Sequence, residues 1–158
     1  MVTERMADGS SGGAEVPALS PAFLIMATGR RVRSEIEQDL AAHGLTLRHL
    51  SALGHLGREP GLSYSELARR AGVTAQSMQA TLRQLEALGA VERRTPAGRG
   101  RTAELHLTAT GLRLRAAGQD AIAAADRRLI ATLPEQDAPA LGRLLLHLAH
   151  TSGPDGDR

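Results

Sequence analysis

The chain has 158 residues, a length that fits one domain with a substantial hydrophobic core and is short for a multi-domain enzyme. Hydrophobic residues make up 42% of the sequence, which indicates a globular protein rather than a disordered one. The absence of cysteine excludes thiol-based redox sensing and thiolate metal sites.

Aromatic side chains are scarce, with one Phe, one Tyr and no Trp. Proteins that bind RNA or single-stranded DNA stack bases on aromatic side chains, so the composition argues against those classes. No apolar run approaches the roughly 20 residues that span a bilayer, and the N-terminus lacks the hydrophobic region of a signal peptide. We therefore expect a soluble, cytoplasmic protein with no membrane partner.

The positive charge is concentrated in one part of the chain. The formal net charge is only +2, but residues 62–108 hold seven arginines against four acidic residues, a local surplus of +3. A basic surplus confined to one segment is typical of a surface that binds duplex DNA.

The first 61 residues predict a tail followed by two helices. Residues 1–18 are rich in Gly, Ser and Ala without periodicity, so we expect a flexible tail before a single domain at 19–150. A helix is predicted at about 20–43, since Pro21 suits a first turn and apolar residues follow at helical spacing. These residues are Ile25, Gly29, Val32, Ile36 and Leu40. Thr46 should cap a second helix, from Leu47 to about Gly57.

Residues 62–89 predict two short helices joined by a glycine turn. Ser63 and Glu66 have the spacing of a capping box, and Gly72 permits the left-handed residue that ends a helix. Thr74 should then cap the second helix of the pair. In that helix, apolar residues three and four apart predict one buried stripe, consisting of Ala75, Met78, Leu82, Leu85 and Leu88.

The opposite face of this second helix is polar, with Gln76, Ser77, Gln79, Ala80, Arg83 and Gln84. Amide and hydroxyl side chains near a helix N-terminus are suited to reading base edges in a major groove. The alternative interpretation of this face alone is an ordinary solvated helix surface.

Two short segments with strand-like alternation follow, at 91–95 and 102–107. The Gly-rich stretch 96–101 lies between them, and arginines stand at 93, 94, 99 and 101. Such a tip suits contact with a minor groove or with phosphates. Helix, turn, helix and basic ribbon in this order predict a mainly α fold with a small β-wing, a winged helix-turn-helix, at about 46–108.

Two further helices are predicted at about 109–132, capped by Thr108, and about 136–150, before a tail at 151–158. In the first, Leu112, Ala116, Ala123, Leu129 and Leu133 fall along the helix. The terminal helices carry more apolar surface than the remaining chain can cover, so we expect a homodimer formed by helices 20–43 and 109–150. The dimer would then present two winged helix-turn-helix units (the reading heads, residues 46–108 of each copy). These would meet half-sites about 34 Å apart on a pseudo-palindromic DNA site. The alternative is that these helices fold back onto the core of one monomer.

The chain resembles the multiple antibiotic resistance regulator (MarR) family over about residues 20–150. The family pattern SELARRxGVS, then LExxGLVERR, then LTxxG corresponds here to SELARRAGVT at 65–74, LEALGAVERR at 85–94 and LTATG at 107–111. Two positions depart from the pattern: Ala80 replaces a frequent arginine, and Gly98 or Arg99 replaces an acidic wing residue. The resemblance implies a DNA-binding transcription regulator, most often a repressor, and leaves the operator sequence open.

The expected contacts with DNA follow from this arrangement. Gln76, Ser77 and Gln79 should contact bases; Thr74 and Arg83, with Ser63 or Ser65, should hold phosphates; Arg99 and Arg101 should enter the minor groove. Arg94 is also a candidate DNA contact. For Arg69, Arg70 and Arg94, an ion pair with Glu66 or Glu92 is an equal alternative to contact with DNA.

The resemblance also implies that a small anionic or phenolic effector binds between the dimer helices and the reading head. Arg30, Arg33 and His49 are the candidates to hold it. The alternative for the arginines is ion pairing with Glu35, Glu37 or Asp39.

Other chemistry is not predicted. Residues 98–103 match a dinucleotide-binding pattern, but a strand follows instead of the required helix. His147 and His150 stand three apart with no further metal ligand near in sequence, so neither metal nor cofactor is expected. No catalytic motif is present, so we do not expect an enzyme. The alternative function is a winged-helix module that docks on proteins without reading DNA.

Overall fold

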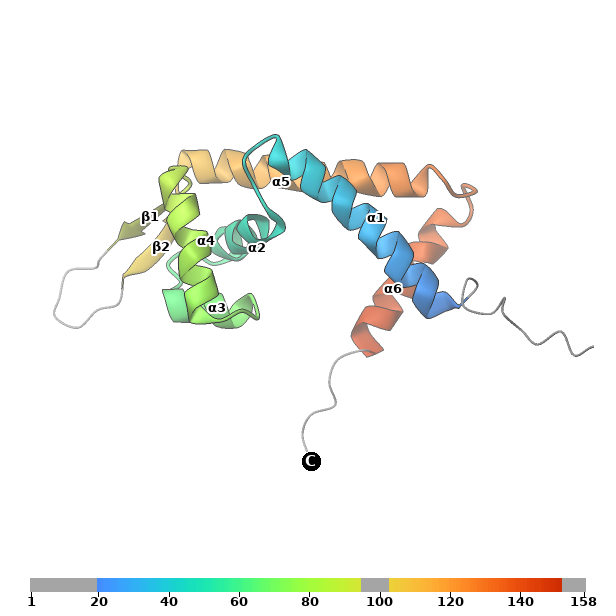
Figure 1. Ribbon diagram of the computed structural model, residues 1–158, viewed down its shortest axis with the longest axis horizontal. Helices are drawn as coiled ribbons and strands as arrows, with labels where there is room; N and C mark the ends of the chain where they lie inside the picture. The colour runs from blue at the N-terminus through green and yellow to red at the C-terminus, as the bar shows by residue number, and fades with distance from the viewer. Residues whose placement is uncertain (1–19, 95–102, 152–158) are drawn as a thin grey trace, which may run out of the picture. The chain divides into compact units, whose positions relative to one another are not determined.

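The computed structural model describes residues 20–94 and 103–151 (Figure 1). The predicted tail at 1–18 and the wing tip with Arg99 and Arg101 lie outside the described residues. So does the predicted tail at 151–158, except for Thr151, which is the last residue of a helix. By its internal contacts the chain divides after Ser34 into two units, residues 1–34 and 35–158.

The described part of the first unit is helical. Helix α1 (Pro21–Ala41) begins there and ends in the second unit. None of its residues up to Ser34 is buried, and Phe23 and Met26 are exposed. Leu40, in the second unit, is the one fully buried member of the predicted stripe.

The second unit contains the predicted winged helix-turn-helix, so the predicted fold class is confirmed. Its elements are α2 (Leu47–Arg58), α3 (Tyr64–Arg70), α4 (Ala75–Ala87), β1 (Val91–Arg94), β2 (Glu104–Leu107), α5 (Ala109–Ile130) and α6 (Ala138–Thr151). Strands β1 and β2 are antiparallel, with Val91 opposite Leu107 and Arg94 opposite Glu104. The segment before α3 adds to this ribbon, because Leu62 forms a bridge with Leu105 that the sequence did not predict.

Four of the helix starts in the second unit are fixed by hydroxyl caps at the predicted positions. The side chains of Thr46, Ser63, Thr74 and Thr108 each accept a hydrogen bond from the backbone amide three residues later. Gly72 (φ +64°) adopts the left-handed conformation that lets the chain turn between α3 and α4. The turn of the helix-turn-helix is therefore encoded locally.

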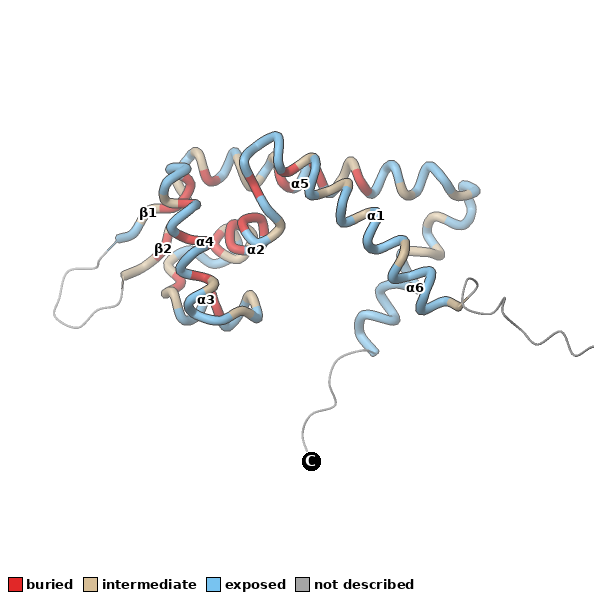
Figure 2. Tube along the Cα trace, in the orientation of Figure 1, coloured by how far each residue is buried: buried red, intermediate tan, exposed pale blue. Residues whose placement is uncertain are grey.

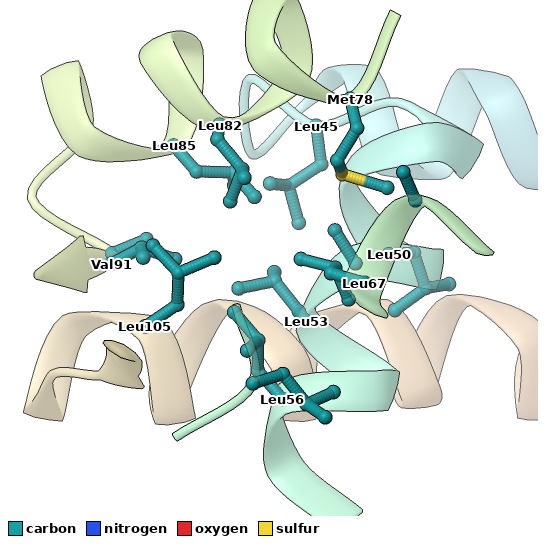
Figure 3. Close-up of a cluster of buried hydrophobic side chains, with 14 of the residues drawn as sticks. Leu45, Leu50, Leu53, Leu56, Leu67, Met78, Leu82, Leu85, Val91 and Leu105 are labelled. Carbon is teal, nitrogen blue, oxygen red and sulfur yellow. The ribbon is translucent and has the colours of Figure 1, made fainter. Parts of the chain in front are cut away.

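Leucines from α2, α3, α4 and the ribbon converge to form the core, as Figure 3 shows. The buried residues in Figure 2 lie mainly on α2 to α5. The side chains with no or almost no exposure are Leu40, Leu53, Leu56, Leu67, Leu82, Leu85 and Leu105. The core thus holds the apolar side of α4 and leaves its other side outward.

Two predicted stripes need correction. In α4, Ala75 and Leu88 are exposed, because they lie at the two ends of the helix, beyond the core that its middle covers. Thr81 is buried instead, and its hydroxyl donates a hydrogen bond to the Ser77 carbonyl at 3.1 Å, which satisfies the buried oxygen.

In α5, the predicted stripe residues Leu112 and Ala116 are exposed. The helix buries small residues instead, namely Gly111, Gly118, Ala121 and Ala125. A Cβ at Gly118 would lie 2.4 Å from Leu50 Cδ1, so the missing side chain is what lets α5 approach α2 closely.

Candidate nucleic-acid interface

The outward face of α4 is available to a partner. Gln76, Gln79 and Arg83 are exposed, while Met78, Leu82 and other residues of the opposite side are buried. The helix is anchored by its apolar side and presents amide and guanidinium groups outward, the arrangement expected of a recognition helix.

Residues at the start of α4 form hydrogen bonds within the protein. Thr74 Oγ1 accepts from the Ser77 amide at 3.2 Å. Ser77 is half-buried, and its hydroxyl accepts a hydrogen bond from Arg48 Nη1 at 3.3 Å. The Ser77 hydroxyl keeps its own proton for donation. Arg48, at the start of α2, thus adds a positive charge beside the recognition helix that the sequence did not indicate.

Gln84 belongs to the outward face in sequence but is tied to α2. Its Oε1 lies 2.8 Å from Nε2 of His49, whose side chain is buried. Nδ1 of His49 accepts from the Thr46 amide at 3.2 Å, completing a capping box at the start of α2. Both ring nitrogens are therefore occupied within the protein, and neither is left for the effector contact predicted for His49.

At the start of α3, the two serines differ in availability. Ser63 caps the helix, and its hydroxyl lies 3.2 Å from Glu66 Oε2 and 3.3 Å from Ser65 Oγ. Ser65 is exposed. Of the two, Ser65 is the freer group to meet a phosphate.

The wing arginines near the ribbon base are ion-paired. Arg94 Nε donates to Glu92 Oε1 at 2.8 Å, which is the pairing considered as an alternative from the sequence. Arg93 Nε donates to Glu86 Oε1 at 3.0 Å and so links β1 to the end of α4. The hydrogen bond to Glu86 raises the pKa of Arg93 above its ordinary value, so its charge is permanent.

The remaining arginines of the region separate into paired and unpaired groups. Arg70 Nη2 donates to Glu59 Oε1 at 2.9 Å, rather than to Glu66 as the alternative interpretation had it. Arg69 and Arg83 are exposed, and neither forms an ion pair with a residue of the two described ranges, 20–94 and 103–151. Arg83 is the cation that the outward face of α4 offers to a phosphate.

The predicted effector arginines lie in the first unit. Arg30 and Arg33 are exposed on α1. Two of the carboxylates considered as their partners bind another residue, because Arg128 of α5 donates to Glu35 Oε2 at 3.2 Å and to Asp39 Oδ2 at 2.8 Å. Those two carboxylates instead tie the end of α1 to α5.

A groove of about 370 Å³ runs between α2 and α5 in the second unit. Two arginines and apolar side chains face it, and the lining consists of Leu47, Leu50, Ser51, Gly54, Arg58, Arg115, Gln119 and Ile122. Gly57 makes room for one of the cations, since a Cβ there would lie 2.7 Å from the Arg115 guanidinium. The groove depends on two helices about 60 residues apart in sequence, so no local pattern predicts it.

The part of the chain that the structure describes has no group of three His, Asp or Glu side chains able to hold a metal ion. His147 and His150 are exposed on α6. None of the described helices is both long enough and apolar enough to cross a membrane.

A short helical pair with an outward polar face, followed by a two-stranded ribbon, defines a winged helix-turn-helix protein. The model of the MarR family matches residues 43–102. The HTH-type transcriptional repressor Rv2887 of Mycobacterium tuberculosis is 40% identical over 116 residues, which cover 72% of this chain and 84% of the relative. The chain therefore belongs to the MarR family.

Solved structures of a similar protein extend the comparison. The crystal structure of the M. tuberculosis MarR family protein Rv2887 in complex with DNA matches with a TM-score of 0.69 at 36% identity. That match covers 82% of this chain and 97% of the other. The same protein in complex with salicylic acid matches with a TM-score of 0.65 at 37% identity, over 82% of this chain and 96% of the other.

Proposed function

We propose that this chain is a transcriptional repressor that binds duplex DNA as a homodimer, with α4 in the major groove. The observation that carries this proposal is the two-sided character of α4. Its apolar side is buried in the core, while Gln76, Gln79 and Arg83 face outward. The family relationship, the repressor name of the 40% identical relative and the DNA complex of Rv2887 support the same function.

The contacts follow from the chemistry of each exposed group. Gln76 and Gln79 read base edges, since a carboxamide both donates and accepts. Arg83 binds a phosphate, and Ser65 donates to another. Arg94 is held by Glu92, so we assign it a smaller share of the attraction to DNA than Arg83.

The homodimer is supported by apolar residues that the single chain leaves exposed. In α6 no residue is buried, although four of its leucines would favour burial: Leu144, Leu145, Leu146 and Leu148. The exposed side chains of Phe23, Leu24, Ile25 and Met26 on α1 have the same character. Burial of such surfaces against a second copy is favourable and places two recognition helices on one pseudo-palindromic site.

We also propose that the groove between α2 and α5 binds a small aromatic carboxylate that releases the DNA. Arg58 and Arg115 supply the positive charge for the carboxylate, and Leu47, Leu50 and Ile122 supply apolar walls for a ring. The salicylic acid complex of Rv2887 supports this ligand class. We thereby assign the effector contact to Arg58 and Arg115 in place of Arg30, Arg33 and His49. No enzymatic role is proposed, and the repressor would act in the cytoplasm, where a bacterial genome lies.

The test of DNA binding is a salt titration. Duplexes selected from random sequence by the purified protein should bind with an affinity that falls steeply as salt concentration rises, because bound phosphates release counterions. Selected sites should be pseudo-palindromic. A module that docks on proteins would select no sequence and show no steep salt dependence, and this result would refute the proposal.

The test of the groove is calorimetry with salicylate on the wild-type protein and on Arg115→Gln. We expect binding by the wild type, weaker binding by the variant, and release of the selected duplex by salicylate from the wild type. If a double variant with both Arg115→Gln and Arg58→Gln bound salicylate as tightly as the wild type, the ligand would bind elsewhere.

A further inference from the structure

The first turn of α2 contacts the recognition helix through two consecutive residues. Arg48 Nη1 donates to Ser77 Oγ at 3.3 Å, and His49 Nε2 lies 2.8 Å from Gln84 Oε1. Ser77 and Gln84 are seven residues apart, which is close to two helical turns, so they lie on the same face of α4. The two contacts therefore hold α4 at two levels along one face.

The hydrogen bonds of His49 determine which nitrogen carries the proton. Nδ1 faces the backbone N–H of Thr46 at 3.2 Å and must accept, so we assign the single ring proton to Nε2. Nε2 then donates to Gln84 Oε1. The backbone amide of Thr46 thus fixes both the tautomer and the direction in which His49 donates.

His49 is only 5% exposed, so it cannot itself contact DNA. Gln84 is exposed, but its side-chain oxygen is already occupied by His49. A bond between a buried ring and the outer face of α4 restricts rotation of α4 about its own axis. Rotation of α4 about that axis would change where Gln76 and Gln79 point.

We propose that His49 is a positioning residue for DNA recognition, which sets the rotation of α4 through its hydrogen bond to Gln84. Gln84 accordingly orients the recognition helix instead of reading bases. This inference rests on the proposed DNA-binding function. It predicts that breaking the bond lowers the preference for the selected duplex over a scrambled duplex of the same composition.

The test uses two substitutions of His49 with different reach. Asn is too short to reach Gln84, whereas Gln is long enough to do so and is a usual partner at this position of a capping box. We expect His49→Asn to lower the affinity ratio of selected to scrambled duplex by about tenfold, the loss of roughly one hydrogen bond. His49→Gln should restore the ratio to within about threefold of wild type.

Thr46→Ala is the control for stability alone. It removes the hydroxyl cap of α2 and should lower Tm, but it leaves the Nε2 donor and Gln84 in place and should leave the affinity ratio near wild type. If the ratio follows Tm across all variants, His49 has only a structural role and the proposal fails.

A double-mutant cycle separates positioning from direct contact. Gln84→Met removes the acceptor, so it should lower the ratio in the wild-type background and have no further effect together with His49→Asn. An equal loss in both backgrounds would mean that Gln84 contacts DNA directly, and would overturn the proposal.

If His49→Asn does not fold, Gln84→Glu replaces it in the comparison. A carboxylate still accepts a hydrogen bond from His49 Nε2, and its negative charge weakens binding to both duplexes alike. The affinity ratio of selected to scrambled duplex should therefore be kept by Gln84→Glu and lost by Gln84→Met. A ratio lost in both, or kept in both, would refute the inference. Failure of the wild type to bind any duplex would instead refute the proposed function.

Discussion

The guanidinium carbon of Arg93 lies 4.8 Å from the centroid of the Tyr64 ring, so a wing arginine stacks on the first residue of α3. Glu86 completes the cluster, because it accepts from Tyr64 Oη at 3.4 Å and from Arg93 Nε at 3.0 Å. Three elements of the reading head, α3, α4 and β1, are thereby joined at one point on the surface.

The ionisation of Tyr64 should report on this cluster. Burial, and next the charge of Glu86, raise the pKa of Tyr64 above its ordinary value of 10.0. The folded state therefore favours the neutral phenol. This contribution to stability is fully present below the ordinary pKa and is lost as pH rises through the raised pKa.

Tyr64 is the only tyrosine and the chain has no Trp, so tyrosinate absorbance measures this single group. We expect the absorbance midpoint to lie at higher pH in the folded protein than in urea. Glu86→Gln should shift the folded midpoint back toward the ordinary value. Equal midpoints in the folded and unfolded protein would contradict the cluster.

Gln79→Ala should relax sequence preference at the base that Gln79 contacts. The expected cost is about 1–3 kcal/mol on the selected duplex and much less on a scrambled one. Gln136→Ala, which changes another exposed glutamine, in the turn before α6, is the matched control and should bind like wild type. Competition binding with both duplexes measures the difference, and a uniform loss on both would show that Gln79 does not read sequence.

Arg83→Gln should weaken binding to all duplexes and reduce the slope of log affinity against log salt by about one unit, the loss of one phosphate contact. Arg127→Gln is the control, because it removes the same charge from an exposed residue of α5 that makes no ion pair with the described residues. If both variants change the slope equally, Arg83 acts through net charge alone and not through a contact.

Gly111→Ala should destabilise the fold by about 1–3 kcal/mol, the usual cost of forcing a group into a packed site. A Cβ at Gly111 would lie 2.0 Å from the Ala90 carbonyl oxygen, and a backbone oxygen cannot move aside as a flexible side chain can. At Gly142 nothing lies within 4 Å of such a Cβ, so Gly142→Ala should be neutral or stabilising, by up to about 1 kcal/mol. Thermal unfolding of both variants provides the comparison; a stable Gly111→Ala would contradict the packing described.

Features encoded within a few residues were predictable from the sequence. The caps at Thr46, Ser63, Thr74 and Thr108 depend on a hydroxyl and an amide three residues apart, and all four form as predicted. The order of helices and strands, and the apolar side of α4 around Leu82, likewise follow from local periodicity.

Features that depend on distant residues were not predictable in the same way. The glycines of α5 are buried because α2 and the segment around Ala90 approach it, which no spacing within α5 indicates. The partners of Arg70 and Arg93 are Glu59 and Glu86, and the sequence suggested nearer acids or DNA instead. His49 was considered for an effector because α2 faces the expected region, but its second nitrogen meets a side chain 35 positions later.

The junction at the start of α5 has a consequence for operator spacing. Thr108 Oγ1 donates to the Gly89 carbonyl oxygen at 2.6 Å, and the Thr108 amide donates to the Ala90 carbonyl oxygen at 3.1 Å. The start of α5 is therefore hydrogen-bonded to the segment that links α4 to the wing. From there α5 continues for 22 residues, about 33 Å of unbroken rod. One residue inserted after Ala125, the last buried residue of α5, would turn everything beyond it by about 100°. If the far end of the rod carries the second copy, such an insertion would leave the reading head folded but put the two heads out of phase with the DNA helix.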